Sequence, residues 1–198
     1  MYPVIRMAKE FWVNRNAGPI NLGEFHISHH VCWPWDLDLW LELNNGRTLT
    51  LYDLGRLVLA KRCGLLSLLK TKRWSLTMAG ASVRYRRRIR VFERFEMCSR
   101  GLCWDDRFFY IEQSIWKKDG ECAGHIVYRS AFVDSVGIIN PDKVLNALGV
   151  NLERPQIPTW IATWIEAENN RPWPPDIPVS ADPSPAYDTA VSLPVLGL

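Results

Sequence analysis

Two carboxylates stand two residues apart, just before a segment with the composition of a helix start. Asp36 and Asp38 follow Pro34, which ends the preceding element because proline lacks an N–H and fixes φ. A carboxylate beside a helix N-terminus can take a proton from water or attack a carbonyl carbon directly. The free N–H groups of the first turn can hold the resulting oxyanion. The pair therefore fits a hydrolase, although turn-forming or capping aspartates have the same spacing, and on spacing alone that plainer interpretation is favoured.

The residues after these carboxylates predict a turn and then a long apolar helix. Asn44, Asn45 and Gly46 have turn chemistry. We expect the helix from about residue 48 to about residue 69, with Gly64 as a point at which it can break in two. Its apolar residues lie on more than one side, which is typical of a buried helix. Its first turn can be capped by a box of Thr50 and Asp53, or by Asn44, Asn45 or Thr48 alone.

Alternating residues predict strands on both sides of this helix. In residues 24–33, one face carries Phe25 and Ile27, and the other carries His26, Ser28 and His30. After the helix, antiparallel strands are expected at 74–91, with a bulge at Gly80, and at 95–104, 107–116 and 122–133, with an Asp-Gly hairpin turn at 118–120. One sheet of about five strands wrapped around the helix explains the apolarity of that helix, so we expect an α+β fold.

The chain divides into four expected segments. Residues 1–23 hold an amphipathic helix and a loop, and this helix covers a sheet edge or a partner, or lies on a membrane surface. Residues 24–150 hold the sheet and the central helix, and end in a short helix at 141–148. Residues 151–170 hold another short helix. Seven of the 28 residues in 171–198 are proline, which predicts an extended tail.

Composition excludes several classes of protein. The 198 residues, 47% hydrophobic and 23% charged, fit about one globular domain. The net charge of +3 excludes a strongly acidic protein and gives only weak support for an anionic ligand. No apolar run reaches the ~20 residues of a membrane-spanning helix, and the start lacks the apolar core of a signal peptide. Five cysteines without a C-x-x-C pair favour a reducing compartment, so we expect a cytoplasmic protein.

The sequence contains none of the common motifs for binding a metal ion or a cofactor. His26, His29 and His30 share one predicted strand, but period two places His29 opposite His30, and no cysteine or carboxylate cluster joins them. We therefore expect structural or surface histidines. The G-x-S-x-G, Walker A, H-E-x-x-H and Rossmann glycine patterns are all absent, which leaves phosphoryl transfer, zinc proteolysis and dinucleotide redox chemistry unsupported.

An arginine-rich segment lies in the second predicted strand. On a strand, Arg84, Arg86, Arg88 and Arg90 share the outward face, whereas Arg87 falls on the inward one. A solvated strand face is the plainest interpretation of this pattern. Guanidinium groups also suit phosphates, such as those of coenzyme A. Nucleic acid is disfavoured because no exposed aromatic side chains interleave with these arginines to stack on bases.

One string carries a family resemblance. Pro34-x-Asp36-Leu37-Asp38, then five residues and Asn44-Asn45-Gly46-Arg47 before a buried helix, resembles the hotdog-fold acyl-CoA thioesterases of the hydroxybenzoyl-CoA thioesterase-like group. The order of the predicted strands agrees over about residues 22–148. The resemblance implies a hotdog fold, no metal or cofactor, and at least a homodimer with the site between subunits.

The resemblance also implies roles for single residues. Asp38 matches the aspartate that the family uses as base or nucleophile. Glu42 stands where the family usually has histidine, and can be a second acid or an ion-pair partner of Arg47 or Arg56. Trp40 stands where plant acyl-carrier thioesterases have a functional asparagine. Supporting and substrate-binding roles are implied for the N–H groups of residues 45–48, for Asn44 and Asn45, for Tyr52 and Trp40 at the acyl group, and for Arg84, Arg86 and Arg88 at phosphate.

The resemblance therefore predicts a thioester hydrolase that acts on acyl-CoA or acyl-carrier thioesters. The alternative is a hotdog protein that binds an acyl chain or a protein partner without catalysis, because Trp40 and Glu42 occupy positions that usually carry chemistry. A hotdog dehydratase is weaker, since such enzymes normally need a histidine paired with an acid. The expected partner is the thioester substrate, with no nucleic acid and no membrane span.

Overall fold

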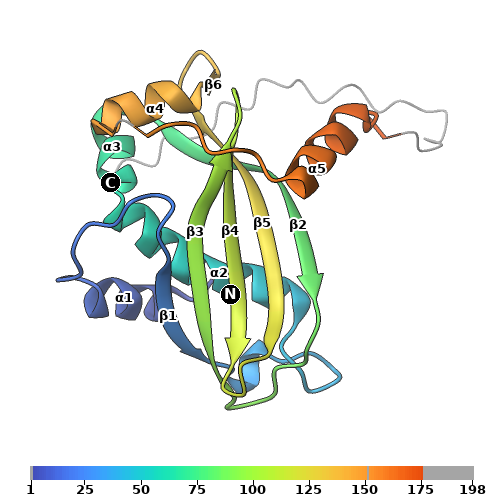
Figure 1. The fold of residues 1–198 in the computed structure, drawn as a ribbon. Helices are drawn as coiled ribbons and strands as arrows, with labels where there is room; N and C mark the ends of the chain where they lie inside the picture. Colours follow the sequence, from blue (N-terminus) through green and yellow to red (C-terminus); the bar gives the residue numbers. More distant parts are fainter. Residues whose placement is uncertain (1, 151, 176–198) are drawn as a thin grey trace, which may run out of the picture. The chain divides into compact units, whose positions relative to one another are not determined.

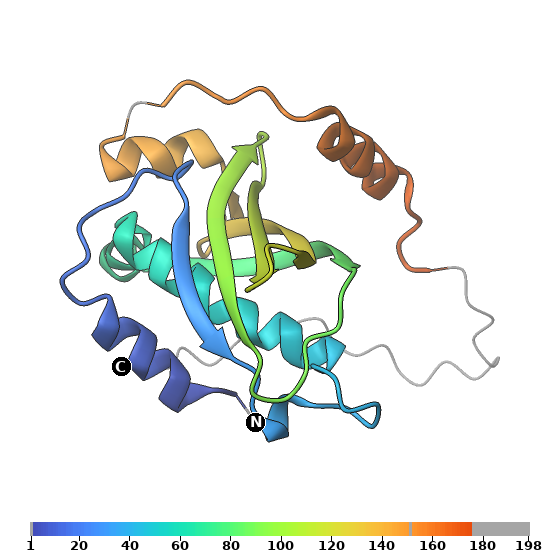
Figure 2. The same ribbon diagram turned by 60° about the horizontal axis from the view of Figure 1, so that its bottom comes forward.

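The computed structural model describes residues 2–150 and 152–175, and the chain divides into two compact units between Ile157 and Pro158. The larger unit holds a sheet and a long helix, which Figures 1 and 2 show from two sides. Its helices are α1 (Val4–Val13), η1 (Pro34–Asp36), α2 (Asn45–Arg62), α3 (Leu65–Lys72) and α4 (Pro141–Leu148). Its strands are β1 (His26–Val31), β2 (Ser75–Tyr85), β3 (Arg94–Trp104), β4 (Phe109–Lys117), β5 (Cys122–Val133) and β6 (Ile138–Ile139).

The sheet is antiparallel and runs in the order β1-β3-β4-β5-β2, with the short β6 paired to β5. Its strands curve around α2, as both ribbon views show (Figures 1 and 2). The predicted hotdog architecture, one sheet wrapped around one long helix, is therefore confirmed. β2 ends the sheet, and most of its residues are exposed.

The central helix α2 is buried on most sides. Leu51, Leu54 and Val58 are completely buried, and the cluster around Leu51 and Leu54 includes Met97 of β3 and Ile115 of β4. Leu51, Leu54 and Val58 lie at helical spacings of three and four, so they share one face. Helix α1 packs against α2 as well. Burial on two sides explains why the helix sequence is apolar almost all round.

The start of α2 corrects one expectation. The helix begins at Asn45 rather than near Thr48, and the side chain of Asn44 accepts the backbone N–H of Arg47 at 2.9 Å. Asn44 is thus the cap, one of the residues considered, and the Thr50–Asp53 capping box does not occur. The cap falls earlier because Asn44 already has an extended backbone that ends the loop. The predicted break occurs at Gly64, with φ of 78°, and α3 follows.

The second strand corrects another expectation. β2 contains the predicted bulge between Met78 and Gly80, but it ends at Tyr85 instead of residue 91. The N–H groups of Arg86 and Arg87 both donate to the carbonyl of Ala123, at 2.8 and 3.1 Å, so the chain leaves the regular ladder there. The residues from 86 to 93 therefore form a loop, and their arginines do not alternate along a strand face. Arginine spacing alone carries no signal for such a turn.

The strand β1 buries its polar face. His26, Ser28 and His30 are buried, whereas Phe25 and Ile27 are about half exposed. Ser28 Oγ and His30 Nε2 lie 2.8 Å apart, and Glu10 of α1 lies 3.8 Å from His30 Nδ1. Polar contacts, as well as apolar ones, therefore hold α1 on the sheet. In the described part of the chain, no group of three or more His, Cys, Asp or Glu could hold a metal ion.

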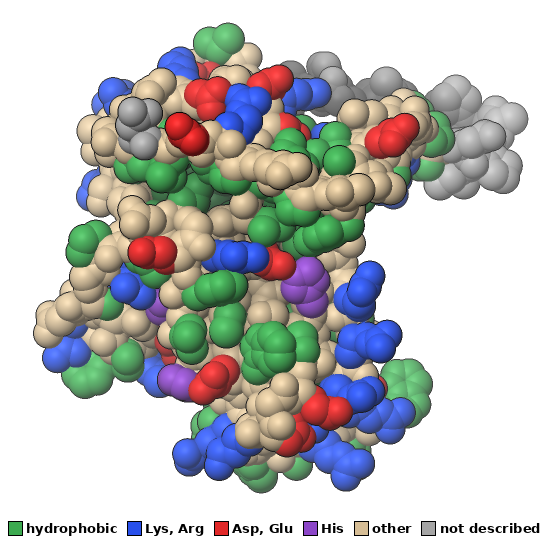
Figure 3. Space-filling model, in the orientation of Figure 1, with side chains coloured by type: hydrophobic (Ala, Val, Ile, Leu, Met, Phe, Trp, Pro, Cys, Tyr) green, Lys and Arg blue, Asp and Glu red, His purple; other side chains and the backbone are tan. Residues whose placement is uncertain are grey.

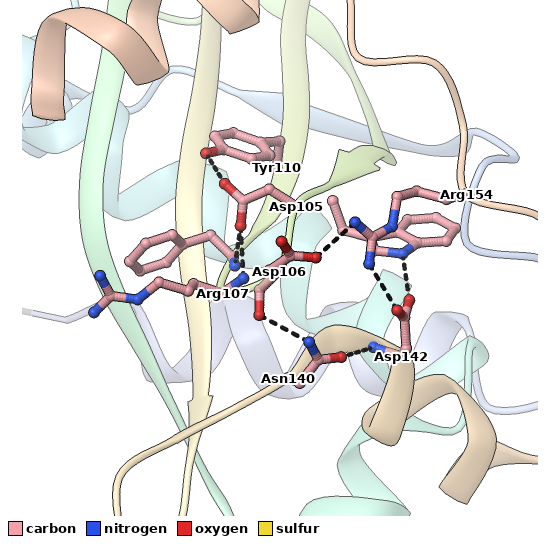
Figure 4. A network of polar contacts seen from close by, with 9 residues as sticks. Asp105, Asp106, Arg107, Tyr110, Asn140, Asp142 and Arg154 are labelled. Carbon is pink, nitrogen blue, oxygen red and sulfur yellow. Dashed lines mark hydrogen bonds and ion pairs between the residues drawn. The ribbon is translucent and has the colours of Figure 1, made fainter.

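A network of hydrogen bonds and ion pairs surrounds the turn between β3 and β4 (Figure 4). Asp105, in the β3–β4 turn, accepts the N–H of Arg107 at 2.7 Å and the hydroxyl of Tyr110 at 2.7 Å. Arg154 reaches Asp106 at 2.7 Å and Asp142, in the first turn of α4, at 2.6 Å. The network ties α4 and the chain around residue 154 to this turn.

The second unit contains α5 (Thr159–Asn170), in which Ile161 is buried. The expected extended tail, from residue 171, lies outside the described residues beyond residue 175. Among the helices in residues 2–150 and 152–175, none is both long and apolar enough to cross a membrane.

Candidate active site

A cavity of about 200 Å³ lies at the N-terminal end of α2. The loop before α2, the first turn of α2, the end of β2 and the facing parts of β4 and β5 enclose it. Of the acids that precede this helix in the sequence, Glu42 lines the cavity, whereas Asp36 and Asp38 do not. The lining residues are Glu42, Leu43, Asn45, Thr48, Tyr85, Arg86, Arg87, Arg88, Ile89, Ile115, Ala123 and Gly124.

Glu42 is the acid of this cavity. The backbone at Glu42 pairs with that at Arg90, and the N–H of Leu43 donates to the carbonyl of Ile89 at 2.8 Å. These contacts hold the backbone at Glu42 in place, and the side chain of Glu42 is 28% exposed. Arg88 Nε lies 2.7 Å from Glu42 Oε2. This contact is an ion pair, and its angles do not meet the criteria of a hydrogen bond; among the described residues, Oε2 has no hydrogen-bond donor. The guanidinium of Arg88 therefore compensates the charge of this carboxylate.

Asp38 lies outside this lining. Its Oδ1 accepts the N–H groups of Trp40 at 2.9 Å and of Glu42 at 3.4 Å. Its own N–H donates to the carbonyl of Glu42 at 2.9 Å, and Leu41 takes a positive φ of 58° in the turn between them. Asp38 thus closes the short loop that presents Glu42.

Asp36 is completely buried and is held by two cations. Arg47 Nε lies 2.6 Å from its Oδ1, and an Arg6 nitrogen lies 2.6 Å from its Oδ2. Oδ2 also accepts the N–H of Trp33 at 3.0 Å. A carboxylate with both oxygens bonded in this way is a structural link between α1, η1 and α2.

The N-terminus of α2 supplies donors to the cavity. Asn44 uses its side chain on the N–H of Arg47, whereas Asn45 lines the cavity and its carbonyl accepts the hydroxyl of Tyr85 at 3.1 Å. The N–H groups of Asn45 and Gly46 belong to the first turn, which has no intrahelical acceptors for them. These groups and the positive end of the helix dipole can stabilise negative charge that develops on a ligand oxygen.

The two aromatic residues expected at the acyl group, Tyr52 and Trp40, are not part of the lining of this cavity. Tyr52 is completely buried one turn below Thr48, and its hydroxyl has no hydrogen-bond partner among the described residues. Burial raises the pKa of Tyr52, so it stays protonated. Trp40 is 73% exposed on the loop. Neither side chain lines the cavity.

The three arginines expected at phosphate divide into two groups. Arg86 and Arg88 line the cavity, but Arg84 does not. Arg84 pairs in register with His125 and is exposed on β2, before the chain leaves the sheet. The loop from residue 86 therefore brings its arginines to the acid and the helix N-terminus.

Several lining residues carried no signal of their own in the sequence. Tyr85 is opposite Gly124 in the β2–β5 register, and together with Thr48 they form part of the wall. The register could have placed Tyr85 there if the end of β2 had been known. From the sequence alone, Ile115 and Ala123 are indistinguishable from other apolar residues in the core of a sheet.

Comparison with known proteins finds related sequences and similar folds. The sequence model of the thioesterase-like superfamily matches residues 32–165. Protein THEM6 of Xenopus laevis is 34% identical over 143 residues, which cover 71% of this chain and 67% of that protein. A putative oleoyl thioesterase from Lactobacillus plantarum superposes with a TM-score of 0.58 at 14% identity, over 69% of this chain and 55% of that chain. DHNA-CoA thioesterase from Staphylococcus aureus gives 0.54 at 14%, over 73% and 91%.

The structural likeness, at such low identity, shows the hotdog fold alone. The family assignment comes from the sequence matches. The match to the family model takes in the loop with both aspartates, the central helix and the strands that line the cavity. The chain belongs to the thioesterase-like superfamily.

Proposed function

We propose that the cavity at the N-terminus of α2 hydrolyses acyl thioesters, with coenzyme A as the carrier. The observation that carries this proposal is the meeting of Glu42, the first turn of α2 and two arginines in one cavity. A base, an oxyanion site and a phosphate-binding edge are the groups that thioester hydrolysis uses. The name of the structurally similar DHNA-CoA thioesterase supports the choice of carrier.

In the proposed reaction, a water molecule attacks the thioester carbonyl carbon while Glu42 takes a proton from that water. The N–H groups of Asn45 and Gly46 stabilise the oxyanion. The C–S bond then breaks, and the proton held by Glu42 passes to the leaving thiolate, which gives a carboxylic acid and a free thiol. Asp38 positions Glu42 through the loop between them. The family position of Asp38 makes it the rival base.

Two further features belong to the proposal. β2 leaves its outer edge without a strand among the described residues, so a second copy of the chain can pair there and form a homodimer. All five cysteines are free thiols, which supports a reducing compartment such as the cytoplasm. Light scattering measures the mass in solution, and a monomer at working concentrations would contradict the dimer.

The direct test is thiol release from acyl-CoA substrates of increasing chain length, monitored with a thiol reagent. Saturable release that is lost in the Glu42→Gln variant supports hydrolysis. The second candidate is a binding protein without turnover, favoured by the presence of Glu42 and Trp40 where relatives of this fold usually carry catalytic groups. Retention of acyl-CoA in equilibrium dialysis, with no thiol released, would replace hydrolysis by that function.

A further inference from the structure

Three aromatic side chains form an exposed cluster at the end of the sheet where the loops around residues 33–44 and 86–93 meet. Trp33 and Trp35 stack with ring centroids 5.4 Å apart, and Phe92 meets the edge of Trp33 at 6.1 Å. Trp35 is 67% exposed and Phe92 is 61% exposed. We call these three residues the aromatic tip. Large aromatic rings in contact with water are unfavourable unless something covers them.

The aromatic tip is held rigidly by backbone contacts. The N–H of Trp33 donates to buried Asp36, which two arginines fix. The N–H of Phe92 donates to the carbonyl of Cys32 at 2.7 Å, and Phe92 has a positive φ of 59°. A positive φ is uncommon for a bulky residue. The fold therefore presents these rings in a fixed arrangement, rather than leaving them on a loose loop.

The segment that carries Phe92 is rich in cations. The segment 86–94 contains five arginines and a single acid, Glu93, which pairs with Lys117 at 3.1 Å. Arg87 and Arg88 are paired with Glu121 and Glu42, respectively. Within residues 2–150 and 152–175, no carboxylate lies within ion-pair distance of the others, Arg86, Arg90 and Arg94. Figure 3 shows Lys and Arg side chains at the lower end of the molecule, with Asp and Glu side chains among them.

We propose that the aromatic tip and its unpaired arginines dock on an anionic lipid surface. Tryptophan rings suit the headgroup region because they join a large apolar surface to a polar N–H. Arginines beside them are attracted to negatively charged headgroups. A protein partner would satisfy the rings equally well, but the three unpaired cations match a surface of uniform negative charge. The loop 86–93 also lines the cavity, so docking would bring the cavity close to lipid.

Sedimentation with vesicles tests the proposal. The full chain is mixed with vesicles of phosphatidylcholine and phosphatidylserine in equal parts, and with vesicles of phosphatidylcholine alone. We expect binding to the anionic vesicles that weakens with salt. Trp35→Ser with Phe92→Ser should lower the affinity at least about tenfold. Arg90→Gln with Arg94→Gln should lower it roughly thirtyfold, because each cation near such a surface counts about equally.

Two matched controls locate the effect. Trp12→Ser removes an equally exposed ring, 65%, from α1. Lys70→Gln with Lys72→Gln removes the same charge from exposed positions of α3. Both controls should bind as the parent chain does, and all variants should keep its melting temperature and its turnover of a short, soluble acyl-CoA.

Three outcomes would overturn the proposal. The first is absence of the parent chain from the vesicle pellet at every salt concentration. The second is a loss of binding in the controls as large as that in the tip variants. The third is a change in the mass of the tip variants in light scattering without any vesicle binding, which would make this surface an interface between copies. Each outcome leaves the proposed hydrolysis untouched, because turnover of a soluble substrate is measured separately.

Discussion

Asp36 Oδ1 lies 2.6 Å from Arg47 Nε, completely buried, and this contact joins the loop before α2 to its first turn. Arg6 reaches the other oxygen of the same carboxylate. Two acids two residues apart therefore have different tasks. Asp36 holds three elements together, and Asp38 closes the turn that presents Glu42.

Replacing Asp36 should destabilise the fold. In the Asp36→Asn variant, two largely buried guanidinium groups lose their counter-charge, and removal of one partner from a buried ion pair typically costs about 3–5 kcal/mol. Urea unfolding measures the loss. The control Asp119→Asn changes an exposed turn aspartate that accepts the N–H of Glu121, and it should cost less than about 1 kcal/mol. Equal stabilities of the two variants would show that the Asp36 contacts contribute little.

Because α2 packs closely against the sheet at Gly55, we expect a larger residue at this position to destabilise the fold. A Cβ at this position would lie 2.5 Å from Ser99 Oγ and 3.0 Å from Met97 Sδ. The overpacking should outweigh the gain of about 1 kcal/mol in helix propensity, and the Gly55→Ala variant should lose about 1–3 kcal/mol. Adding Ser99→Ala removes the nearest atom and should recover part of the loss. Thermal unfolding of the single and double variants checks this, and the absence of any recovery would rule out the clash.

Stability should fall in mild acid because of His30. Burial, then Arg6 and Lys9, lower the pKa of His30 to about 3, and burial lowers the pKa of His26 to about 4. Glu10 lies near His30, but it is already paired with Lys9 at 2.9 Å, so it does not reverse the shift. In the unfolded chain, each histidine has its ordinary pKa of 6.5 and binds a proton in mild acid, whereas in the folded chain it stays neutral there. The stability they contribute is complete above pH 6.5 and declines below it.

Unfolding free energies between pH 7 and 5 test this slope, in a range where most carboxylates stay ionised. The variant His30→Gln should show a shallower decline than the parent chain. His29→Gln, which changes an exposed histidine on the same strand, should not alter the slope. Identical slopes for the parent and His30→Gln would mean that folding does not lower the pKa of His30, which would contradict the prediction.

The sequence predicts the fold well and the site only in part. Apolar residues on several sides of residues 48–69 predicted a buried helix, and alternation predicted the strands, because both patterns report burial directly. The end of β2 could not be predicted, since it depends on contacts of Arg86 and Arg87 with the distant Ala123. The same turn decides which arginines reach the cavity. Spacing alone also could not tell buried Asp36 from Asp38, because burial of an acid depends on where Arg6 and Arg47 lie.

Binding of the carrier should depend on the loop and not on the strand. Arg86 lines the cavity and Arg84 does not, so Arg86→Ala should raise KM for acyl-CoA several-fold with little change in kcat, as expected for loss of uniform binding. Arg84→Ala is the matched control and should leave both constants unchanged. If instead only Arg84→Ala raises KM, the phosphates bind along the sheet, away from the cavity.

The most direct test of the account is kcat for acyl-CoA hydrolysis by Glu42→Gln and Asp38→Asn, with the melting temperature of each variant measured in parallel. Loss of a general base typically lowers the rate by about 10²–10⁴-fold. The account predicts a loss of this size for Glu42→Gln in a normally folded protein. Asp38→Asn keeps an oxygen that accepts the N–H of Trp40, and it should stay within about tenfold of the parent rate. A normal rate in Glu42→Gln, with the loss in Asp38→Asn, would contradict the account.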